Sequence, residues 1–163
     1  MAYTFEDMFD QHCTPVIDIF NYYIKNSFAA YPEEPVGYEI YDHFLNMARG
    51  YPAVVIKDEK ETIVGFAFLH AYRSGQIFKR VAEITYFILP EHTGKSIGTK
   101  VLNQFRSAAK EKGIDTLLAS ISSRNEGSLQ FHLKNGFKEC GRFRRIGRKF
   151  GEDFDVVWMQ LDL

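Results

Sequence analysis

Glu83 and His132 stand out because their residue types can do chemistry and their sequence surroundings are unusual for them. Glu83 interrupts the apolar run "VAEITYFIL", where a carboxylate is out of place unless it faces solvent at an edge or serves a site. His132 lies in "NEGSLQFHLKNGF", one helical turn after Ser128, and such a lone histidine can equally be a structural side chain. Both residue types can exchange protons near neutral pH, so both are candidates for acid–base chemistry.

A short polar segment after this apolar run contains Gly94-Lys95-Ser96, the ending of a phosphate-binding loop. A nucleoside-triphosphate loop would need a glycine where Leu89 stands, and the Gly-x-Gly-x-x-Gly dinucleotide fingerprint is absent as well. The start of a helix near Ser96 would still offer free N–H groups that favour an anion, and Lys95 could add charge. From spacing alone, a plain strand-to-helix turn remains the alternative.

Composition limits the class of protein. The chain has 163 residues, of which 45% are apolar, so we expect one domain, 1–163, that buries its own core. A net charge of −1 argues against a nucleic-acid or general polyanion binder, and the two cysteines show no zinc-like spacing. The start "MAYTFEDMFD" is not a signal peptide, and no apolar run could span a membrane, so a cytoplasmic protein is expected. The basic segment 141–151 is interpreted as a solvated strand pair with its turn.

The elements that must position these residues follow from local patterns. Thr14-Pro15 is a typical helix start, and apolar spacing predicts further helices over 36–47, from Ser96 to about 113, and over 125–134. Strands are expected on both sides of a turn at 58–60, over 81–89, over 115–122, and twice near the end of the chain. This order predicts a mixed α/β sandwich built on a largely central sheet.

Several segments together resemble the GCN5-related N-acetyltransferase (GNAT) superfamily, in particular its phosphinothricin acetyltransferase-like branch. Residues 93–98 align with the acyl-CoA loop pattern Gln/Arg-x-x-Gly-x-Gly/Ala, from which Thr93 and Ser96 depart. Ser96 is acceptable there if its φ is negative, since it could then cap the helix. The segments "NEGSLQFHLKNGF", "GRKFGEDFDVVWMQLDL" and "FNYYIKNS" resemble the branch's helix signature, C-terminal segment and first helix. The resemblance implies the GNAT fold, an α/β (α+β) architecture whose mixed central sheet has a V-shaped strand splay and flanking helices.

The same resemblance implies acetyl-CoA as co-substrate, with no metal. The pyrophosphate would sit on the backbone of 93–98, and the pantetheine arm would pair with the strand before it. Asn125 is expected to cap its helix and to contact the coenzyme, and Ser128 to complete the cap or to hydrogen-bond His132 or the coenzyme. The implied coenzyme-binding residues are Tyr86, Phe87, Ile88, Thr93, Gly94, Lys95, Ser96, Ile97, Gly98, Asn125 and Ser128.

For catalysis, the resemblance makes Glu83 the base that takes a proton from an ammonium, directly or through water. His132 would orient the amine or protonate the leaving thiolate. The pair Tyr72-Arg73 matches an aromatic-Arg pair of the branch, and its guanidinium could clamp a substrate carboxylate, although a solvated Arg is equally compatible. Apolar walls of the amine site are expected from Phe78, Phe28 and Tyr31. Pro32 stands where relatives that acetylate phosphinothricin tend to carry Arg, which disfavours that herbicide as the substrate.

We therefore expect direct acetyl transfer from acetyl-CoA to a small amine that is amino-acid-like. No covalent enzyme intermediate is expected, because neither cysteine lies near the motifs. An N-terminal acetyltransferase of proteins or peptides and a non-catalytic acyl-CoA-binding module remain as alternatives. The branch resemblance also implies a homodimer.

Overall fold

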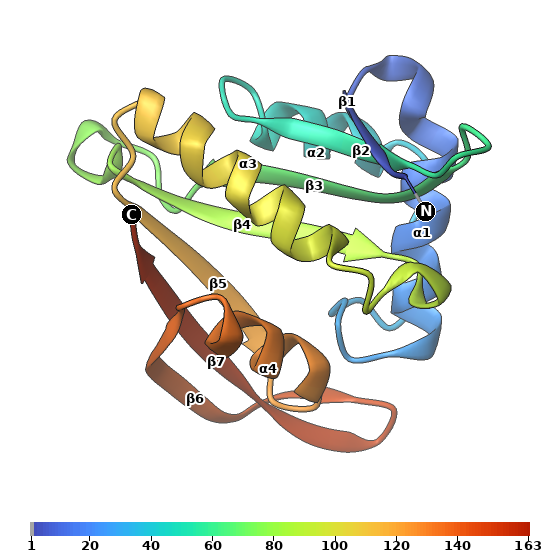
Figure 1. The fold of residues 1–163 in the computed structure, drawn as a ribbon. Coiled ribbons are helices and arrows are strands. Elements are labelled where there is room, and N and C mark those ends of the chain that lie inside the picture. The colour runs from blue at the N-terminus through green and yellow to red at the C-terminus, as the bar shows by residue number, and fades with distance from the viewer. Residues whose placement is uncertain (1) are drawn as a thin grey trace.

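A seven-stranded mixed sheet forms the centre of the computed structural model, which describes residues 2–163 (Figure 1). Its strands lie in the order β1 (Thr4–Asp7), β2 (Ala53–Lys57), β3 (Ile63–Ala71), β4 (Val81–Ile88), β5 (Thr116–Ser122), β7 (Glu152–Asp162) and β6 (Lys138–Lys149). Neighbours are antiparallel except β4 and β5, which are parallel. The predicted mixed α/β sandwich with a central sheet is confirmed.

Strands β4 and β5 pair only at their beginnings. Their register runs from Val81 opposite Thr116 to Glu83 opposite Leu118 and then stops. Strand β4 continues to Ile88 with β3 alone, and β5 continues with β7 alone. Figure 1 shows the two strands diverging beyond this point, which is the expected V-shaped splay. One edge of β4 is therefore left unpaired along its second half.

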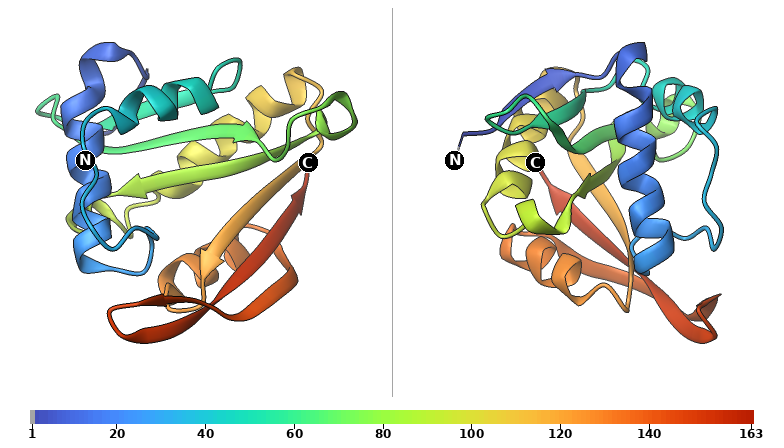
Figure 2. Two further views of the ribbon diagram at one scale, coloured as in Figure 1. Left: turned by 180° about the vertical axis from the view of Figure 1, so that it is seen from behind. Right: turned by 90° about the vertical axis from the view of Figure 1, so that its right-hand side faces the viewer.

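Four α-helices cover the sheet in pairs. They are α1 (Cys13–Asn26), α2 (Ile40–Met47), α3 (Ile97–Glu111) and α4 (Glu126–Lys134). Figure 1 shows α3 and α4 in front of the sheet, and the rear view in Figure 2 shows α1 and α2 behind β2, β3 and β4. Each layer buries its own apolar cluster, centred on Phe105 and Leu102 in front and on Phe66 and Phe68 behind. Among residues 2–163, no helix is both long and apolar enough to cross a bilayer.

Two helix starts differ from the sequence prediction. The helix predicted from Thr14-Pro15 begins at Cys13, because a 3₁₀ turn over Asp10–His12 feeds directly into it and places His12 at the cap position. Thr14 is therefore not the capping residue. The second helix begins at Ile40 rather than at Val36.

The side chain of Asn21 explains why Val36 stays outside that helix. It accepts a hydrogen bond from the Val36 N–H at 2.8 Å and donates one to the Val36 carbonyl at 3.0 Å, which fixes Val36 in a loop. The edge strand β1 was not predicted. Its residues pair with β2, but "TFED" is too short to show a period of its own.

Candidate active site

A cavity of about 870 Å³ occupies the fork between β4 and β5. Its walls combine the second half of β4, the loop before α3, the first turns of α3 and α4, strand β5, and the segment after α1. This volume is typical of sites that enclose a small organic ligand. The sheet divides the cavity into a front part beside α3 and α4 and a rear part beside α1 and α2. We call the rear surface of the sheet, with Phe68, His70, Glu83 and Ser120, the acceptor face.

The loop 93–98 has the backbone geometry of an anion site. Gly94 has φ 72° and Ser96 has φ 64°, so left-handed residues alternate with Lys95, whose φ is not positive. Such alternation turns successive N–H groups toward one side and forms a concavity that attracts anions. The condition under which Ser96 could cap α3, a negative φ, is not met. Its side chain makes no capping hydrogen bond, and the position has the conformation that favours glycine.

The start of α3 lies against α4 at Gly98. A Cβ added at Gly98 would come within 3.1 Å of the Phe131 ring, so a glycine is what allows this close approach. Of the loop residues expected to hold the coenzyme, Lys95 alone does not line the cavity. Those that do are Thr93, Gly94, Ser96, Ile97 and Gly98.

The unpaired edge of β4 offers backbone groups to a ligand in the fork. The Leu89 N–H donates to the Val64 carbonyl at 2.8 Å. Because an antiparallel ladder alternates its hydrogen-bonded pairs, Phe87 points its backbone groups toward β3, whereas Tyr86 points its N–H and C=O toward the open side. The Ile88 carbonyl, on the same side as that of Tyr86, already accepts a hydrogen bond from the Tyr23 hydroxyl.

Glu83 lies at the last paired position of β4 and β5, where the fork begins, and it lines the cavity. Its side chain is 20% exposed, and burial raises its pKa to about 7. The carboxyl group faces His70, its partner across the β3–β4 ladder, with 4.0 Å between Glu83 Oε2 and His70 Nε2. His70 Nδ1 lies 3.0 Å from the Ala71 carbonyl, which can only accept, so Nδ1 carries a proton and Nε2 is left as an acceptor. Burial also lowers the pKa of His70.

His132 is held as a neutral imidazole in the front part of the cavity. Its Nδ1 lies 2.7 Å from the Ser128 carbonyl and 3.2 Å from Ser128 Oγ, so Nδ1 donates to the carbonyl. Its Nε2 therefore accepts a hydrogen bond, and the donor is the Tyr86 hydroxyl. Burial lowers the pKa of His132 to about 4 and raises that of Tyr86 well above its ordinary value. Asn125 caps α4 as predicted, because its side chain accepts from the Ser128 N–H at 3.2 Å.

This arrangement changes what the imidazole can do. A neutral His132 with Nδ1–H already bonded to a carbonyl has no free proton for a leaving group. The proton that points between the two side chains belongs to Tyr86, so His132 acts on the cavity through that hydroxyl. The sequence singled out Tyr86 for its backbone alone. Finding its side-chain role needs the position of α4 against β4, which no local pattern contains.

The residues expected around the amine divide into two groups. Tyr31 lines the rear of the cavity, where its hydroxyl lies 3.5 Å from Ser120 Oγ and its ring stacks on Phe154. Phe28 does not line the cavity but supports it from outside, edge-on to Phe154 at 5.8 Å between ring centres. Apolar side chains that the sequence did not single out complete this rear wall, namely Phe20, Phe44, Met47 and Phe68.

Tyr72, Arg73 and Phe78 lie on the loop between β3 and β4, outside the cavity lining. Arg73 is exposed, and its guanidinium carbon lies 5.5 Å from the centre of the Tyr72 ring. The Tyr72 ring contacts both Phe78 and Trp158 edge-on. Trp158 pairs with Ser120 of the cavity wall, so this group stands near the closed end of the fork.

Within residues 2–163, no group of His, Cys, Asp and Glu side chains is arranged to hold a metal ion. Cys13 and Cys140 are free thiols. A further cation at the cavity is Lys134, near the end of α4, which the sequence analysis did not select. An anionic ligand on the front side would therefore meet the loop 93–98 and one lysine.

Comparisons with known proteins agree with this geometry. The model of the acetyltransferase (GNAT) family matches residues 16–137. The chain is 29% identical to the L-amino acid N-acyltransferase MnaT of Escherichia coli (strain K12) over 93% of this chain and 88% of that protein. It is 28% identical to the L-methionine sulfoximine/L-methionine sulfone acetyltransferase of Salmonella typhimurium, over 100% of this chain and 95% of that one.

A solved structure extends the likeness to the bound co-substrate. The GNAT superfamily phosphinothricin acetyltransferase of Sinorhizobium meliloti, crystallised with acetyl-CoA, superposes with a TM-score of 0.93 at 27% identity, covering 100% of this chain and 89% of that chain. The fork, the anion loop and the acidic residue at the fork thus occur in a chain that matches this family over most of its length. The protein belongs to the GNAT family of acetyltransferases and uses acetyl-CoA as its acetyl donor.

Proposed function

We propose that the protein transfers the acetyl group of acetyl-CoA directly to the primary amine of an amino-acid-like small molecule with an apolar side chain, and that Glu83 is the base. The observation that carries this proposal is the position of Glu83. It lies where β4 and β5 separate, with a raised pKa, in the same cavity as the anion loop 93–98.

The site has groups that suit acetyl-CoA. The concave loop 93–98 and Lys134 suit its pyrophosphate, and the free N–H and C=O of Tyr86 suit the amides of its pantetheine arm. Bound there, acetyl-CoA supplies an acetyl thioester in the fork. In the transfer, the bond from the amine nitrogen to the carbonyl carbon forms and the bond from that carbon to sulfur breaks.

Glu83 takes the first of the two protons that the amine nitrogen loses. An alkyl ammonium has a pKa of about 10, so it must lose a proton before it can attack. Glu83 accepts that proton on the acceptor face, directly or through one water. The attacking nitrogen loses its second proton when the amide forms, and the departing sulfur gains one, so this proton passes from nitrogen to sulfur through solvent and coenzyme A leaves as the thiol. The Tyr86 hydroxyl is not the source, because its proton is held in the hydrogen bond to His132 Nε2 and burial raises its pKa. Charge is balanced when Glu83 releases its proton to solvent.

The acceptor face supports an apolar substrate side chain. Phe68 and Phe44 line the cavity beside Glu83, and Tyr31 closes it on the side of β5. The printed names of the relatives, an L-amino acid N-acyltransferase and an L-methionine sulfoximine/L-methionine sulfone acetyltransferase, support an amino-acid-like acceptor. Arg73, near the closed end of the fork, is proposed as the clamp for the α-carboxylate.

A panel of paired amines tests this proposal. Coenzyme A release would be measured with L-methionine and L-phenylalanine and with their decarboxylated twins, using wild type and Arg73→Ala. We expect the carboxylated members to react best, and Arg73→Ala to lower their kcat/KM by at least about tenfold while sparing the twins. If the decarboxylated amines react as well as the amino acids in both variants, Arg73 does not bind a substrate carboxylate and the acceptor need not carry one. Absence of turnover with every amine would favour a binding module.

A homodimer is also part of the proposal. Phe143, Ile146 and Phe150 are more than half exposed on the β6–β7 hairpin, and apolar side chains gathered in this way support a contact between copies. Light scattering coupled to size exclusion would give the mass directly. The cytoplasmic location stays a prediction from the N-terminal sequence.

A further inference from the structure

Lys149 is the most unusual charged residue outside the residues used above. It lies in the basic segment interpreted from sequence as solvated, yet its side chain is fully buried. Its Nζ donates to the Ser27 carbonyl at 2.7 Å and to the Ala30 carbonyl at 2.5 Å. It also lies 4.9 Å from the centre of the Phe150 ring. A lysine is almost never buried without such partners, because removing an ammonium from water is costly.

These hydrogen bonds join two distant parts of the chain. Lys149 is the last residue of β6, at the tip of the β6–β7 hairpin, whereas Ser27 and Ala30 belong to the segment that follows α1. Figure 2 shows this segment reaching toward the hairpin across the open side of the fork. The next residue in the segment is Tyr31, the aromatic wall of the cavity.

The β6–β7 hairpin also forms the surface against which Tyr31 packs. Phe154 pairs with Gly147 across the β6–β7 ladder. A Cβ added at Gly147 would lie 2.1 Å from the Phe154 ring, so the ring packs directly on the glycine backbone. Tyr31 stacks on that ring at 5.6 Å between ring centres with an interplanar angle of 20°. Tyr31 is therefore held by its backbone through Lys149 and by its ring through Phe154.

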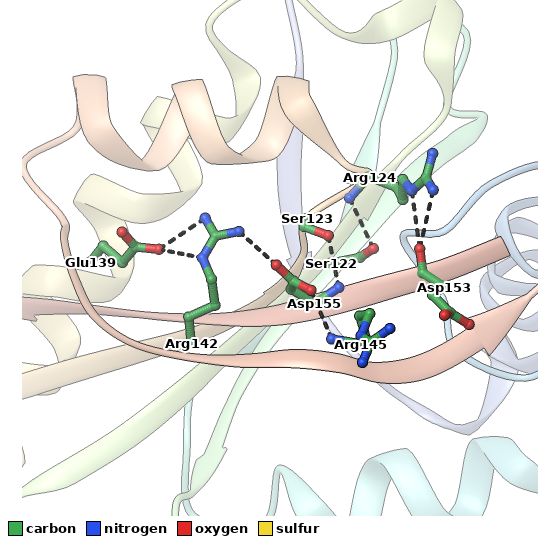
Figure 3. A network of polar contacts seen from close by, with 8 residues as sticks. All are labelled: Ser122, Ser123, Arg124, Glu139, Arg142, Arg145, Asp153 and Asp155. Carbon is green, nitrogen blue, oxygen red and sulfur yellow. Dashed lines mark hydrogen bonds and ion pairs between the residues drawn. The ribbon is translucent and has the colours of Figure 1, made fainter.

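A polar network fixes the irregular shape of the hairpin (Figure 3). The β6–β7 register shifts between Phe143 and Gly147, and Arg145 there has φ 49°. Asp155 holds this bulge, since its carboxylate accepts from the Arg145 N–H at 2.8 Å and from the Arg142 guanidinium at 2.9 Å. These hydrogen bonds also lower the pKa of Asp155. The hydrogen bonds of Asp155, far from the cavity, thus fix the bend that directs Lys149 toward the segment after α1.

We propose that Lys149 is a positioning residue for the amine acceptor, acting through Tyr31. It anchors the backbone of 27–30 so that Tyr31 closes the cavity beside Ser120 and Glu83. The proposal rests on the amine-binding role given above to the acceptor face. It predicts that Lys149 affects binding of the amine and leaves binding of acetyl-CoA, on the opposite side of the fork, nearly unchanged.

Steady-state kinetics of Lys149→Met test this division. Methionine keeps the length and apolar stem of the side chain but cannot donate to the two carbonyls. We expect KM for the amine to rise by about tenfold or more, with KM for acetyl-CoA within about twofold of wild type. Arg148→Met is the matched control, because it removes an exposed cation from the neighbouring position of the hairpin. Equal changes in both KM values, or none, would overturn the proposal.

A double-mutant cycle asks whether the effect passes through Tyr31. Once Tyr31→Ala has removed the aromatic wall, Lys149→Met should change kcat/KM for the amine by no more than about twofold. An undiminished effect in the Tyr31→Ala background would show that Lys149 acts by another route. A general loss of folding would lower acetyl-CoA binding and activity together in every background, and circular dichroism of each variant would identify it.

A measurement without any amine separates this inference from the proposed function. Chymotrypsin cleaves after aromatic residues unless proline follows, so Phe28, within the anchored backbone, is the site to monitor, whereas the Tyr31–Pro32 bond resists. We expect cleavage after Phe28 to be at least about tenfold faster in Lys149→Met than in wild type and in Arg148→Met, as read by mass spectrometry. Unchanged cleavage would refute the anchor even if amines are acetylated. Faster cleavage without acetylation of any amine would instead locate the failure in the proposed function.

Discussion

Replacing Glu83 with glutamine is expected to stabilise the fold at pH 8 while removing most of the activity. Burial raises the pKa of this carboxyl group from 4.5 to about 7. The folded state therefore favours the protonated form, and ionisation of this group in the unfolded chain above pH 4.5 opposes folding. At about 1.4 kcal/mol per pKa unit, the destabilisation at pH 8 amounts to about 3 kcal/mol.

The sign and the pH range of this effect follow from the two pKa values. Below pH 4.5 the carboxyl group is protonated in both states, so wild type and Glu83→Gln differ little. Between pH 4.5 and about 7 the unfolded chain ionises first, and wild type loses stability relative to the variant. Above pH 7 the difference levels off. Glutamine has nearly the same shape as glutamate and never ionises. The free energy of unfolding of Glu83→Gln therefore does not change with pH through this position.

Urea unfolding at pH 5 and pH 8 measures the difference, and coenzyme A release measures the activity. We expect the gain in stability to be less than about 1 kcal/mol at pH 5 and about 3 kcal/mol at pH 8. Turnover should fall by on the order of a hundredfold or more, the usual contribution of a general base. Glu91→Gln, at an exposed position shortly after β4, controls for the loss of one carboxylate. A stability difference that is the same at both pH values would refute the buried, raised-pKa carboxyl group.

Two further substitutions test the front side of the cavity. Tyr86→Phe removes the hydroxyl that donates to His132, and because this proton is not available to the departing sulfur we expect kcat to stay within about threefold of wild type, with KM for acetyl-CoA nearly unchanged; a fall on the order of a hundredfold would identify this hydroxyl as the proton source. Ser96→Gly relieves a left-handed backbone and should raise the free energy of unfolding by about 1 kcal/mol, whereas Ser96→Ala, which keeps the strain, should not. Thermal unfolding of both Ser96 variants decides the second point, and equal melting temperatures for glycine and alanine would contradict it.

The local parts of this protein could be predicted from its sequence. The cap of α4 by Asn125 and the contact from Ser128 to His132 depend on residues three or four positions apart, and the structure has both. The turn at 58–60 is likewise confirmed, with Asp58 Oδ1 accepting from the backbone of Lys60 at 2.9 Å. Such features follow from helical and turn geometry within a few residues. All the residues that determine them are therefore close together in the sequence, where they can be recognised.

The departures arise where a distant segment decides the local structure. Val36 has a helical sequence context, but the side chain of Asn21 holds it in a loop. Ser96 takes a left-handed conformation because the chain must turn from β4 into α3 while the loop faces the fork. Neither constraint is visible in the residues next to these positions.

The sequence by itself determined most of the helices and strands, though not β1 or the start of α2, and the residue types of the site, because hydrophobic period, capping and turn chemistry act over a few residues. It also placed Glu83 and the anion loop a fixed distance apart along the chain. Only the tertiary structure decided that β4 and β5 stop pairing at Glu83, that Tyr86 meets His132, and that Lys149 is buried. Each of these depends on strand register or on contacts between segments far apart in sequence, and a change of one residue in register turns a side chain to the opposite face of the sheet.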